Sequence, residues 1–243
     1  MSDFAGKTYW LVGASEGLGE ALAHQLSALG ANLVLSARNQ DRLDVVAQAV
    51  PGEARVVTID IADDDSVAEA AKAAGDVDGM VFLAGIYWPM PATEWDLSQG
   101  VAMADVNFTG AFRVLGHVVP KMVARDTGHI VITGSLSGFR GLPGAIGYGA
   151  SKAGVMSLAE SLRADLWRTG VTVQLANPGF IKTRLTDKNQ FKMPFLMTSE
   201  EAAKQMVGLM KTTKFQLHFP MVFSWVFRLS RLLPDWLYYR VFA

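Results

Sequence analysis

Short runs of apolar residues alternate along the chain with longer segments whose apolar positions recur at helical spacing. The runs are TYWLV, NLVLS, RVVTI, GMVFLAG, HIVITG, VTVQLA and FQLHF. Strands buried on both faces read as continuous apolar runs, and helices between them imply crossover connections. The pattern therefore predicts a doubly wound parallel α/β sheet of about seven strands with helices on both faces. Without repeats or low-complexity linkers, residues 1–243 are expected to form one domain.

A glycine-rich segment, GASEGLG, follows the first run and opens the first helical segment. Gly13, Gly17 and Gly19 permit a tight turn, a close approach to a pyrophosphate, and close packing of the helix on the strand. The same segment satisfies the G-x-S-x-G pattern of a hydrolase nucleophile elbow, with Ser15 as the nucleophile. That alternative is disfavoured because such an elbow needs several preceding strands, and only one precedes Gly13. Ser15 is expected instead to hydrogen-bond a phosphate or to cap the helix.

The segment from Ser135 to Lys152 carries the residues of a candidate active site. Tyr148 and Lys152 are four positions apart at the start of a helical pattern, so their side chains share one face. A nearby ammonium group favours the phenolate, and Lys152 is therefore expected to lower the pKa of Tyr148 from about 10. Ser135 ends the run HIVITG, where its hydroxyl could donate to the same substrate oxygen. Together, these three side chains predict an active site that transfers a proton to or from one substrate oxygen.

The glycine spacing G-x-x-x-G-x-G and this serine, tyrosine and lysine set resemble the short-chain dehydrogenase/reductase family, in its shorter single-domain branch. The resemblance runs from Lys7 to about Phe219. It implies a Rossmann-type fold and an NAD(P)-dependent oxidoreductase that interconverts a carbonyl and an alcohol. It also implies a fourth catalytic residue, Asn107, which would hold a water linking Lys152 to solvent. The alternative is an asparagine that bonds the helix backbone at a local bend.

The resemblance further implies which residues contact the dinucleotide. Asp60 and Ile61 would contact the adenine ring, while the Ile181 backbone and the Thr183 hydroxyl would engage the nicotinamide carboxamide. The implied set lies at or after the ends of the strand-like runs and comprises Gly13, Ser15, Glu16, Gly17, Leu18, Gly19, Ala37, Arg38, Asp60, Ile61, Ala84, Gly85, Tyr148, Lys152, Pro178, Gly179, Ile181 and Thr183.

The end of the second run favours NADP(H), with NAD(H) still possible. An NAD site places an acid on the ribose 2′-hydroxyl, but Ala37 stands at the family's acidic position. Arg38 follows it, and a guanidinium suits a 2′-phosphate. The alternative is that Arg38 simply lies in a solvated loop. Glu16 counts against the phosphate, because many NADP-preferring relatives carry a basic residue just before the second glycine.

Composition excludes several other classes. The formal charge of −1 provides no basic field for nucleic acid. There is no cysteine, and the four histidines lack metal-ligand spacing, so no metal is expected. No apolar run reaches the length of a bilayer span and no leader is recognised, so a cytoplasmic location is expected. A cofactor-binding sensor without turnover stays an alternative on the same fold, disfavoured because a pure binder has no need for all four catalytic residues.

Two segments near the C-terminus are expected to shape substrate binding. By resemblance, residues 184–197 form a lid, which ends where Thr198 and Glu201 make a capping box. The tail, residues 220–243, places apolar residues on more than one side of a helix, with Arg228 and Arg231 between them. We expect this tail to make a subunit contact or to cover the pocket, with peripheral membrane contact as the less favoured alternative. Either role of this apolar tail implies an apolar carbonyl or alcohol substrate. The resemblance implies a homodimer or tetramer, paired through the Asn107 and Lys152 helices.

Overall fold

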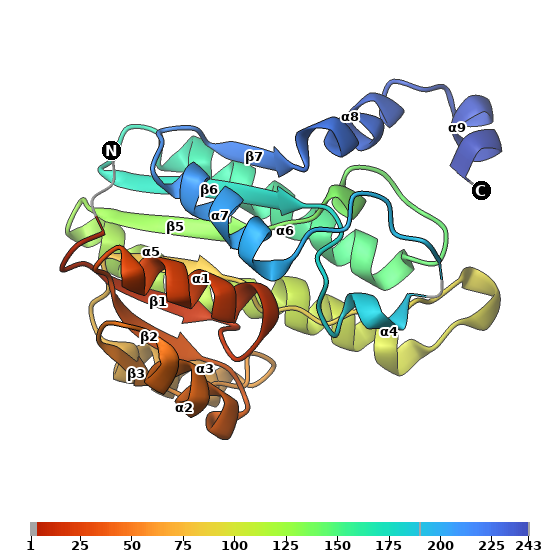
Figure 1. Cartoon of the computed structure of the whole chain (residues 1–243). Coiled ribbons are helices and arrows are strands. Elements are labelled where there is room, and N and C mark those ends of the chain that lie inside the picture. The colour runs from red at the N-terminus through yellow and green to blue at the C-terminus, as the bar shows by residue number, and fades with distance from the viewer. Residues whose placement is uncertain (1–3, 190, 243) are drawn as a thin grey trace.

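A parallel β-sheet forms the centre of the molecule (Figure 1). The computed structural model describes residues 4–189 and 191–242, so Gln190 of the lid and Ala243 of the tail lie outside the described residues. The sheet has seven strands in the order β3-β2-β1-β4-β5-β6-β7, which confirms the predicted doubly wound, Rossmann-type fold. The strands are β1 (Thr8–Val12), β2 (Asn32–Ser36), β3 (Ala54–Val56), β4 (Gly79–Phe82), β5 (Gly128–Thr133), β6 (Val171–Pro178) and β7 (Gln216–Phe219).

Helices cover both faces of this sheet. One face packs against α1 (Gly17–Ala28), α2 (Gln40–Ala49) and α7 (Ser199–Met210). The other packs against α3 (Asp64–Ala74), α5 (Gly110–Ala124) and α6 (Ile146–Asp165). The remaining helical elements are α4 (Leu97–Ala104), the π-helical turn η2 (Asp105–Thr109), the 3-10 turns η1 (Ala92–Glu94), η3 (Leu136–Gly138) and η4 (Thr186–Lys188), and the tail helices α8 (Met221–Ser230) and α9 (Asp235–Phe242).

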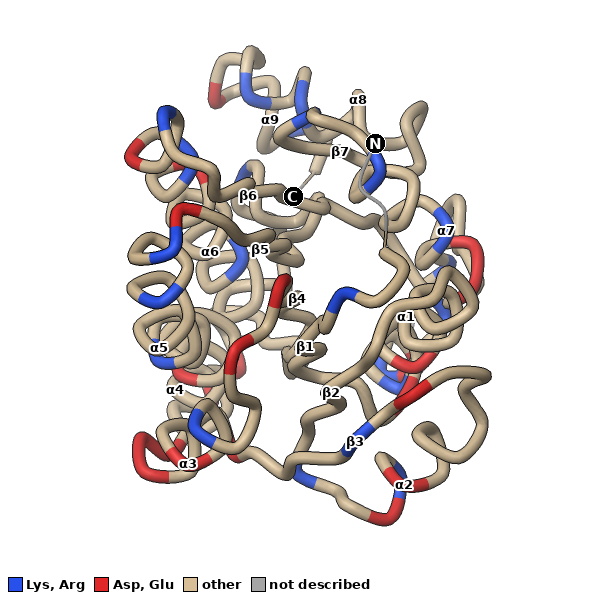
Figure 2. Tube along the Cα trace, turned by 90° about the vertical axis from the view of Figure 1, so that its left-hand side faces the viewer, with Lys and Arg blue, Asp and Glu red and all other residues tan. Residues whose placement is uncertain are grey.

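The continuous apolar runs are explained by two cores, one on each face. Successive strand residues point to opposite faces. In β1, Tyr9 and Leu11 therefore join the core under α1 and α7, whereas Trp10 and Val12 join the core under α3, α5 and α6. The strands β1, β2 and β4 carry no charged residue, and the charges lie on the outer helices, on the loops and on the edge strand β3 (Figure 2).

The strand order places the expected ligand site. The chain passes from β1 to β2 and β3 on one side, then returns so that β4 pairs with the other edge of β1. Loops leaving β1 and β4 at their carboxyl ends therefore diverge, and open α/β sheets bind ligands at this switch point. The glycine-rich segment follows β1, and Ala84 and Gly85 follow β4.

The structure differs from the expected elements at the third strand, which ends at Val56 and not at Ile59. The segment beyond still runs beside β2, because the Val57 and Ile59 amides donate to the carbonyls of Leu35 and Ala37. By contrast, the capping box at the start of α7 is confirmed. In the part of the chain described, no helix is both long and apolar enough to cross a membrane.

Candidate active site

The expected serine, tyrosine and lysine meet at the carboxyl end of the sheet. Ser135 follows β5 and starts the η3 turn, while Tyr148 and Lys152 lie one turn apart at the beginning of α6. Tyr148 and Ser135 line the same hollow, and Ser135 is near enough to affect the pKa of Tyr148. The Lys152 ammonium lies 5.7 Å from the centroid of the Tyr148 ring. The structure therefore brings all three groups to one place, as the spacing predicts.

The electrostatics of this cluster correct one expectation. Burial raises the pKa of Tyr148 to about 12, although the neighbouring Ser135 acts in the opposite direction. Lys152 is almost fully buried, donates to the Thr133 carbonyl oxygen at 3.0 Å, and has its own pKa lowered by burial to about 8. The prediction that the pKa of Tyr148 lies below 10 is thus wrong for this structure, because burial disfavours the charged phenolate. Burial therefore favours the protonated form of Tyr148.

Asn107 lies in the π-helical turn between α4 and α5 and is fully buried. Its Oδ1 accepts from the Ile86 amide at 2.7 Å, and its Nδ2 donates to the Ile86 carbonyl at 2.9 Å and to Ser151 Oγ at 3.0 Å. The alternative that Asn107 bonds its own helix backbone is therefore wrong. A Cβ on Gly85 would lie 3.3 Å from Asn107 Oδ1 and 3.7 Å from Lys152 Nζ, which shows that both side chains border the same glycine.

The glycine-rich loop has the geometry that a dinucleotide requires. Gly13 has φ +102°, and a Cβ there would come within 2.6 Å of the Ala84 amide nitrogen, so only glycine fits between the ends of β1 and β4. Glu16 occupies the N-cap of α1 without a side-chain capping bond, so the alternative that Ser15 caps this helix is wrong. The amide groups of the first turn of α1 are left to bind an anion, which fits a pyrophosphate.

Charged residues flank this loop. Glu16 accepts hydrogen bonds from Arg42 of α2 at 2.7 Å and from Arg184 of the lid at 2.5 Å. Arg38, after β2, is exposed and has no ion-pair partner among residues 4–189 and 191–242. Beside it, Ala37 is half-buried. Arg38 is therefore available to an anionic group, while the Glu16 carboxylate is already neutralised by two arginines.

The remaining expected cofactor residues divide into two groups. Asp60 is half-buried beyond β3, but the Ile61 side chain is packed into the core, so Ile61 can reach a ligand only through its backbone. Thr183 lies against the glycine-rich loop, since a Cβ on Gly17 would be 3.0 Å from its methyl group. The structure thus brings the end of β6 and the segment after it, which carry Pro178, Gly179, Ile181 and Thr183, next to the start of α1, which carries Gly17, Leu18 and Gly19.

A hollow of about 720 Å³, counting space open to solvent, lies above Ser135 and Tyr148. Its lining includes large apolar side chains from four segments: Leu142, Phe180, Leu185, Phe191, Phe223 and Phe227. The lid supplies Leu185 and Phe191, and the inner side of α8 supplies Phe223 and Phe227. The expectation that the tail covers the pocket agrees with this arrangement.

Two polar residues of the hollow are not among the site residues expected from the sequence. Tyr87 packs edge-to-face on Tyr148, with ring centroids 5.1 Å apart, and donates to Asn189 of the lid at 2.9 Å. Ser137 donates through its hydroxyl to Ser135 Oγ at 2.9 Å. Tyr87 lies just after the Ala84 and Gly85 pair, so a search for side chains flanking that pair would have found it.

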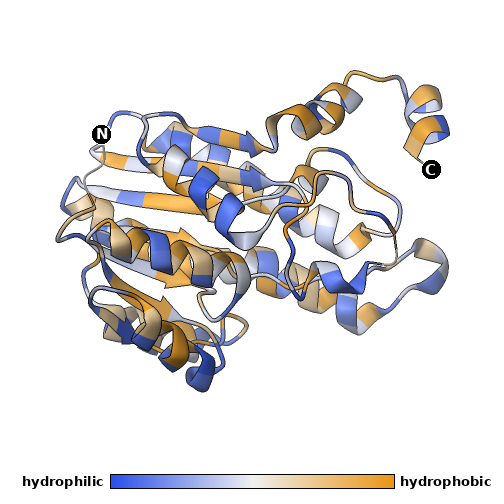
Figure 3. Cartoon of the chain, in the orientation of Figure 1, coloured by the Kyte–Doolittle hydropathy of each residue, from blue (hydrophilic) through white to orange (hydrophobic). Residues whose placement is uncertain are grey.

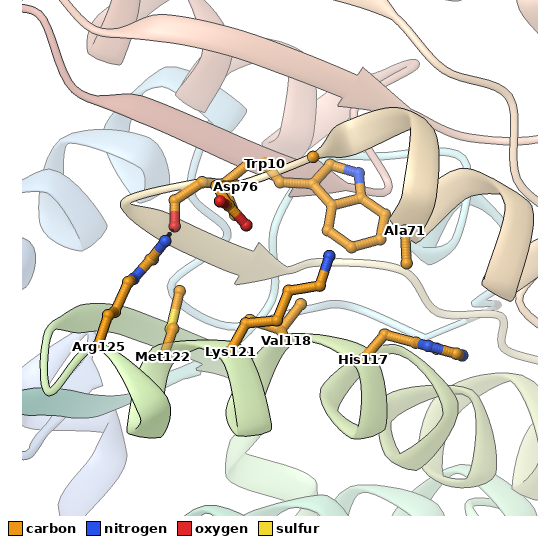
Figure 4. Close-up of a pocket in the computed structure, with 10 residues that line it drawn as sticks. Trp10, Ala71, Asp76, His117, Val118, Lys121, Met122 and Arg125 are labelled. Carbon is orange, nitrogen blue, oxygen red and sulfur yellow. Dashed lines mark hydrogen bonds between the residues drawn. The ribbon is translucent and has the colours of Figure 1, made fainter.

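A second, smaller hollow lies between the sheet and α5 (Figure 4). Its lining includes Trp10, Asp76, His117 and Lys121, and Arg125 donates to the Val77 carbonyl oxygen there. Val77 precedes β4, so this hollow is at the amino ends of the strands. Ligands of parallel sheets bind at the opposite edge, and the hollow is not a candidate active site.

Known proteins resemble the chain in sequence and in fold. A family model described as short chain dehydrogenase matches residues 7–193. An uncharacterized oxidoreductase of Myxococcus xanthus is 36% identical, covering 97% of this chain and 96% of the relative. A 3-oxoacyl-[acyl-carrier-protein] reductase of Rickettsia conorii is 31% identical, covering 77% of this chain and 78% of the relative. The crystal structure of a short chain dehydrogenase/reductase from Burkholderia phymatum in complex with NAD has a TM-score of 0.87 at 24% identity, covering 96% of this chain and 95% of that one. The protein is an oxidoreductase that belongs to the short-chain dehydrogenase/reductase family.

Proposed function

We propose that the chain is an NADP-preferring oxidoreductase that interconverts an apolar ketone or aldehyde and the corresponding alcohol. One observation carries the proposal. Tyr148, which is half-buried, and Ser135 together border an apolar hollow next to a glycine-rich loop that fits a dinucleotide. A hydroxyl pair that can bind one oxygen, beside a dinucleotide site, suits hydride transfer to a carbonyl carbon.

Tyr148, Ser135 and Lys152 have different roles in the proposed reaction. A nicotinamide cofactor, when bound, supplies or accepts the hydride. Tyr148 gives its proton to the carbonyl oxygen, and its raised pKa keeps that proton available at neutral pH. Ser135 hydrogen-bonds the same oxygen as negative charge develops there. Burial holds the pKa of Lys152 near 8, so this group can both release and take up a proton.

Asn107 is the proposed link between Lys152 and solvent. Both N–H groups of its amide are used by Ile86 and Ser151, and Oδ1 accepts one bond from Ile86. An amide oxygen has two lone pairs, so Oδ1 can accept one further hydrogen bond, from a water near Lys152. This water would return the proton that Tyr148 gives up.

The substrate and cofactor preferences rest on the lining of the site. The apolar side chains around the hollow favour a hydrophobic carbonyl compound over a sugar or a small polar acid. By its name, the Rickettsia relative reduces an oxoacyl group, which is compatible with a ketone substrate. Arg38 supports the NADP preference because it is exposed at the end of β2 with no ion-pair partner in the described residues. The proposal also includes that the enzyme is cytoplasmic and forms a homodimer or tetramer.

The test is the decrease of NADPH absorbance with a panel of apolar and polar aldehydes and ketones. Tyr148→Phe should abolish turnover, and Tyr239→Phe, which changes an exposed tyrosine of α9, should not. Arg38→Ala should reduce the preference for NADPH over NADH at least tenfold, which is about 1.4 kcal/mol. Turnover that survives Tyr148→Phe undiminished would refute the mechanism. Cofactor binding without turnover on any carbonyl would favour the sensor.

A further inference from the structure

The tail helix α8 has one face that is buried against the substrate hollow and an opposite face that is exposed. Phe223, Ser224, Phe227 and Ser230 are buried, and both phenylalanines line the substrate hollow. The opposite side carries apolar side chains that are 46–70% exposed: Met221, Val222, Trp225, Val226 and Leu229. Their spacing puts all five on one side of the helix. We call these five residues the outer face of α8.

The apolar surface continues beyond this helix. Leu232 follows α8 and is 80% exposed, and Trp236 and Val241 of α9 are also exposed. In Figure 3, α8 is largely hydrophobic and α9 carries both hydrophobic and hydrophilic residues, and both helices stand apart from the sheet in Figure 1. Single exposed apolar residues are ordinary, but a contiguous group of this size marks an interaction surface. Within the described residues, no other element covers it.

The tail is held so that this surface faces outward. Arg140, in the loop after η3, donates to the Leu233 carbonyl oxygen at 2.8 Å and pairs with Asp235 at 2.6 Å. Its guanidinium also lies 3.8 Å from the centroid of the Tyr238 ring. The Tyr238 hydroxyl donates to the Gly141 carbonyl oxygen. These contacts fix the inner side of the tail against the body, so the outer face does not result from a loose chain end.

The tail carries a net positive charge. Residues 220–243 contain three arginines, Arg228, Arg231 and Arg240, and a single acid, Asp235, which is paired with Arg140. The chain as a whole has a formal charge of −1, so its tail is basic while the remainder is acidic. Arg228 lies over the Trp225 ring, 4.1 Å from its centroid. An apolar helix face with tryptophan and arginine beside it is typical of helices that lie in the interface of a membrane.

A second copy of the chain fits this surface less well. In a two-fold contact a patch meets itself, so the arginines of one copy would approach those of the other. On an anionic lipid surface, each arginine can pair with a negatively charged headgroup. The apolar side chains of the outer face leave water and enter the apolar part of the bilayer. We infer that the outer face of α8, with the arginines of the tail, binds the protein peripherally to the surface of an anionic bilayer. The subunit contact favoured by the sequence pattern is then not the role of this face.

Vesicle flotation with the full-length protein tests this inference without relying on its activity. The protein should float with vesicles of phosphatidylcholine and phosphatidylglycerol at low salt, and much less with phosphatidylcholine alone. The double variant Trp225→Gln/Leu229→Gln should lose at least about tenfold in partitioning, because two large apolar side chains no longer enter the bilayer. Arg231→Gln/Arg240→Gln should lose about fivefold or more for each arginine removed, on anionic vesicles only.

Trp167→Gln is the matched control. Trp167 is 65% exposed and has Arg163 over its ring at 4.3 Å, as Trp225 has Arg228, but it lies outside the tail. This variant should float like the wild type, and circular dichroism should show that all variants are folded. Wild-type protein that stays unbound with anionic vesicles would overturn the inference, as would flotation that Trp225→Gln/Leu229→Gln leaves unchanged. If this variant instead changes the oligomeric mass in light scattering while the wild type ignores vesicles, the face is a subunit contact.

Discussion

A buried histidine at the amino end of the sheet should make the stability of this protein depend on pH. His129 of β5 is bonded on both ring nitrogens, by the Tyr9 hydroxyl at Nδ1 (2.9 Å) and by Gln174 Oε1 at Nε2 (2.9 Å). The Gln174 amide nitrogen faces three carbonyl oxygens, of Leu209, Thr212 and Lys214, so its oxygen must face the ring. The network therefore assigns the neutral tautomer with a proton on Nε2.

The magnitude follows from the pKa of this ring. Burial lowers the pKa of His129 from 6.5 to about 4. Between these values the unfolded chain binds a proton that the folded chain does not, so stability is complete above about pH 6.5 and falls as the pH drops toward 4. A difference of about 2.5 pKa units corresponds to a loss of about 3 kcal/mol in the free energy of unfolding.

The assay is urea unfolding at a series of pH values, for the wild type and for His129→Gln. His218, whose pKa is also lowered to about 4 by burial and by Arg228, titrates over the same range, so only the difference between the two proteins isolates His129. His129→Gln should be less stable at neutral pH, because it disturbs the bonds to Tyr9 and Gln174, but its stability should fall less steeply toward pH 4. Equal slopes for the two proteins, or a His129 resonance that titrates near pH 6.5 in the folded state, would refute the reasoning.

Three further substitutions test other parts of the structure. Gly13→Ala should destabilise the fold and weaken dinucleotide binding at least tenfold, as measured by calorimetry, because its Cβ would meet the Ala84 amide nitrogen at 2.6 Å where φ is +102°. Unchanged binding would contradict the close approach of β1 and β4. Tyr87→Phe removes the 2.9 Å bond to Asn189 of the lid, so KM for the carbonyl should rise about fivefold with a smaller change in kcat; a change in kcat alone would place Tyr87 in the chemical step. Thr198→Ala breaks the capping box of α7 and should cost about 1 kcal/mol in urea unfolding, with the kinetics on apolar carbonyls unchanged.

Local patterns in the sequence were enough to predict the architecture and the central cluster. Each apolar run reports the burial of its own strand, so all seven strands were predicted, with errors at the ends of strands: β3 and β4 end three residues earlier than their runs, and β6 continues two residues further. The four-residue step from Tyr148 to Lys152 is a property of one helix, and the glycines after β1 are needed by one turn. Such features involve neighbours in the chain, which is why the sequence alone determined them.

Other features depend on residues that only the fold brings together. The pKa of Tyr148 rises because distant segments exclude water from it, and no spacing along the chain reports that loss of water. Glu16 hydrogen-bonds Arg184, which lies 168 positions away in the sequence, and Tyr87 hydrogen-bonds Asn189, which lies 102 positions away. The apolar stripe of the tail could be recognised in the sequence, but its division into a pocket face and an outer face required the contacts of Arg140 with the tail. Tertiary structure decided these points because burial and charge pairing depend on distance in space, whereas hydrophobic periodicity depends only on position in the chain.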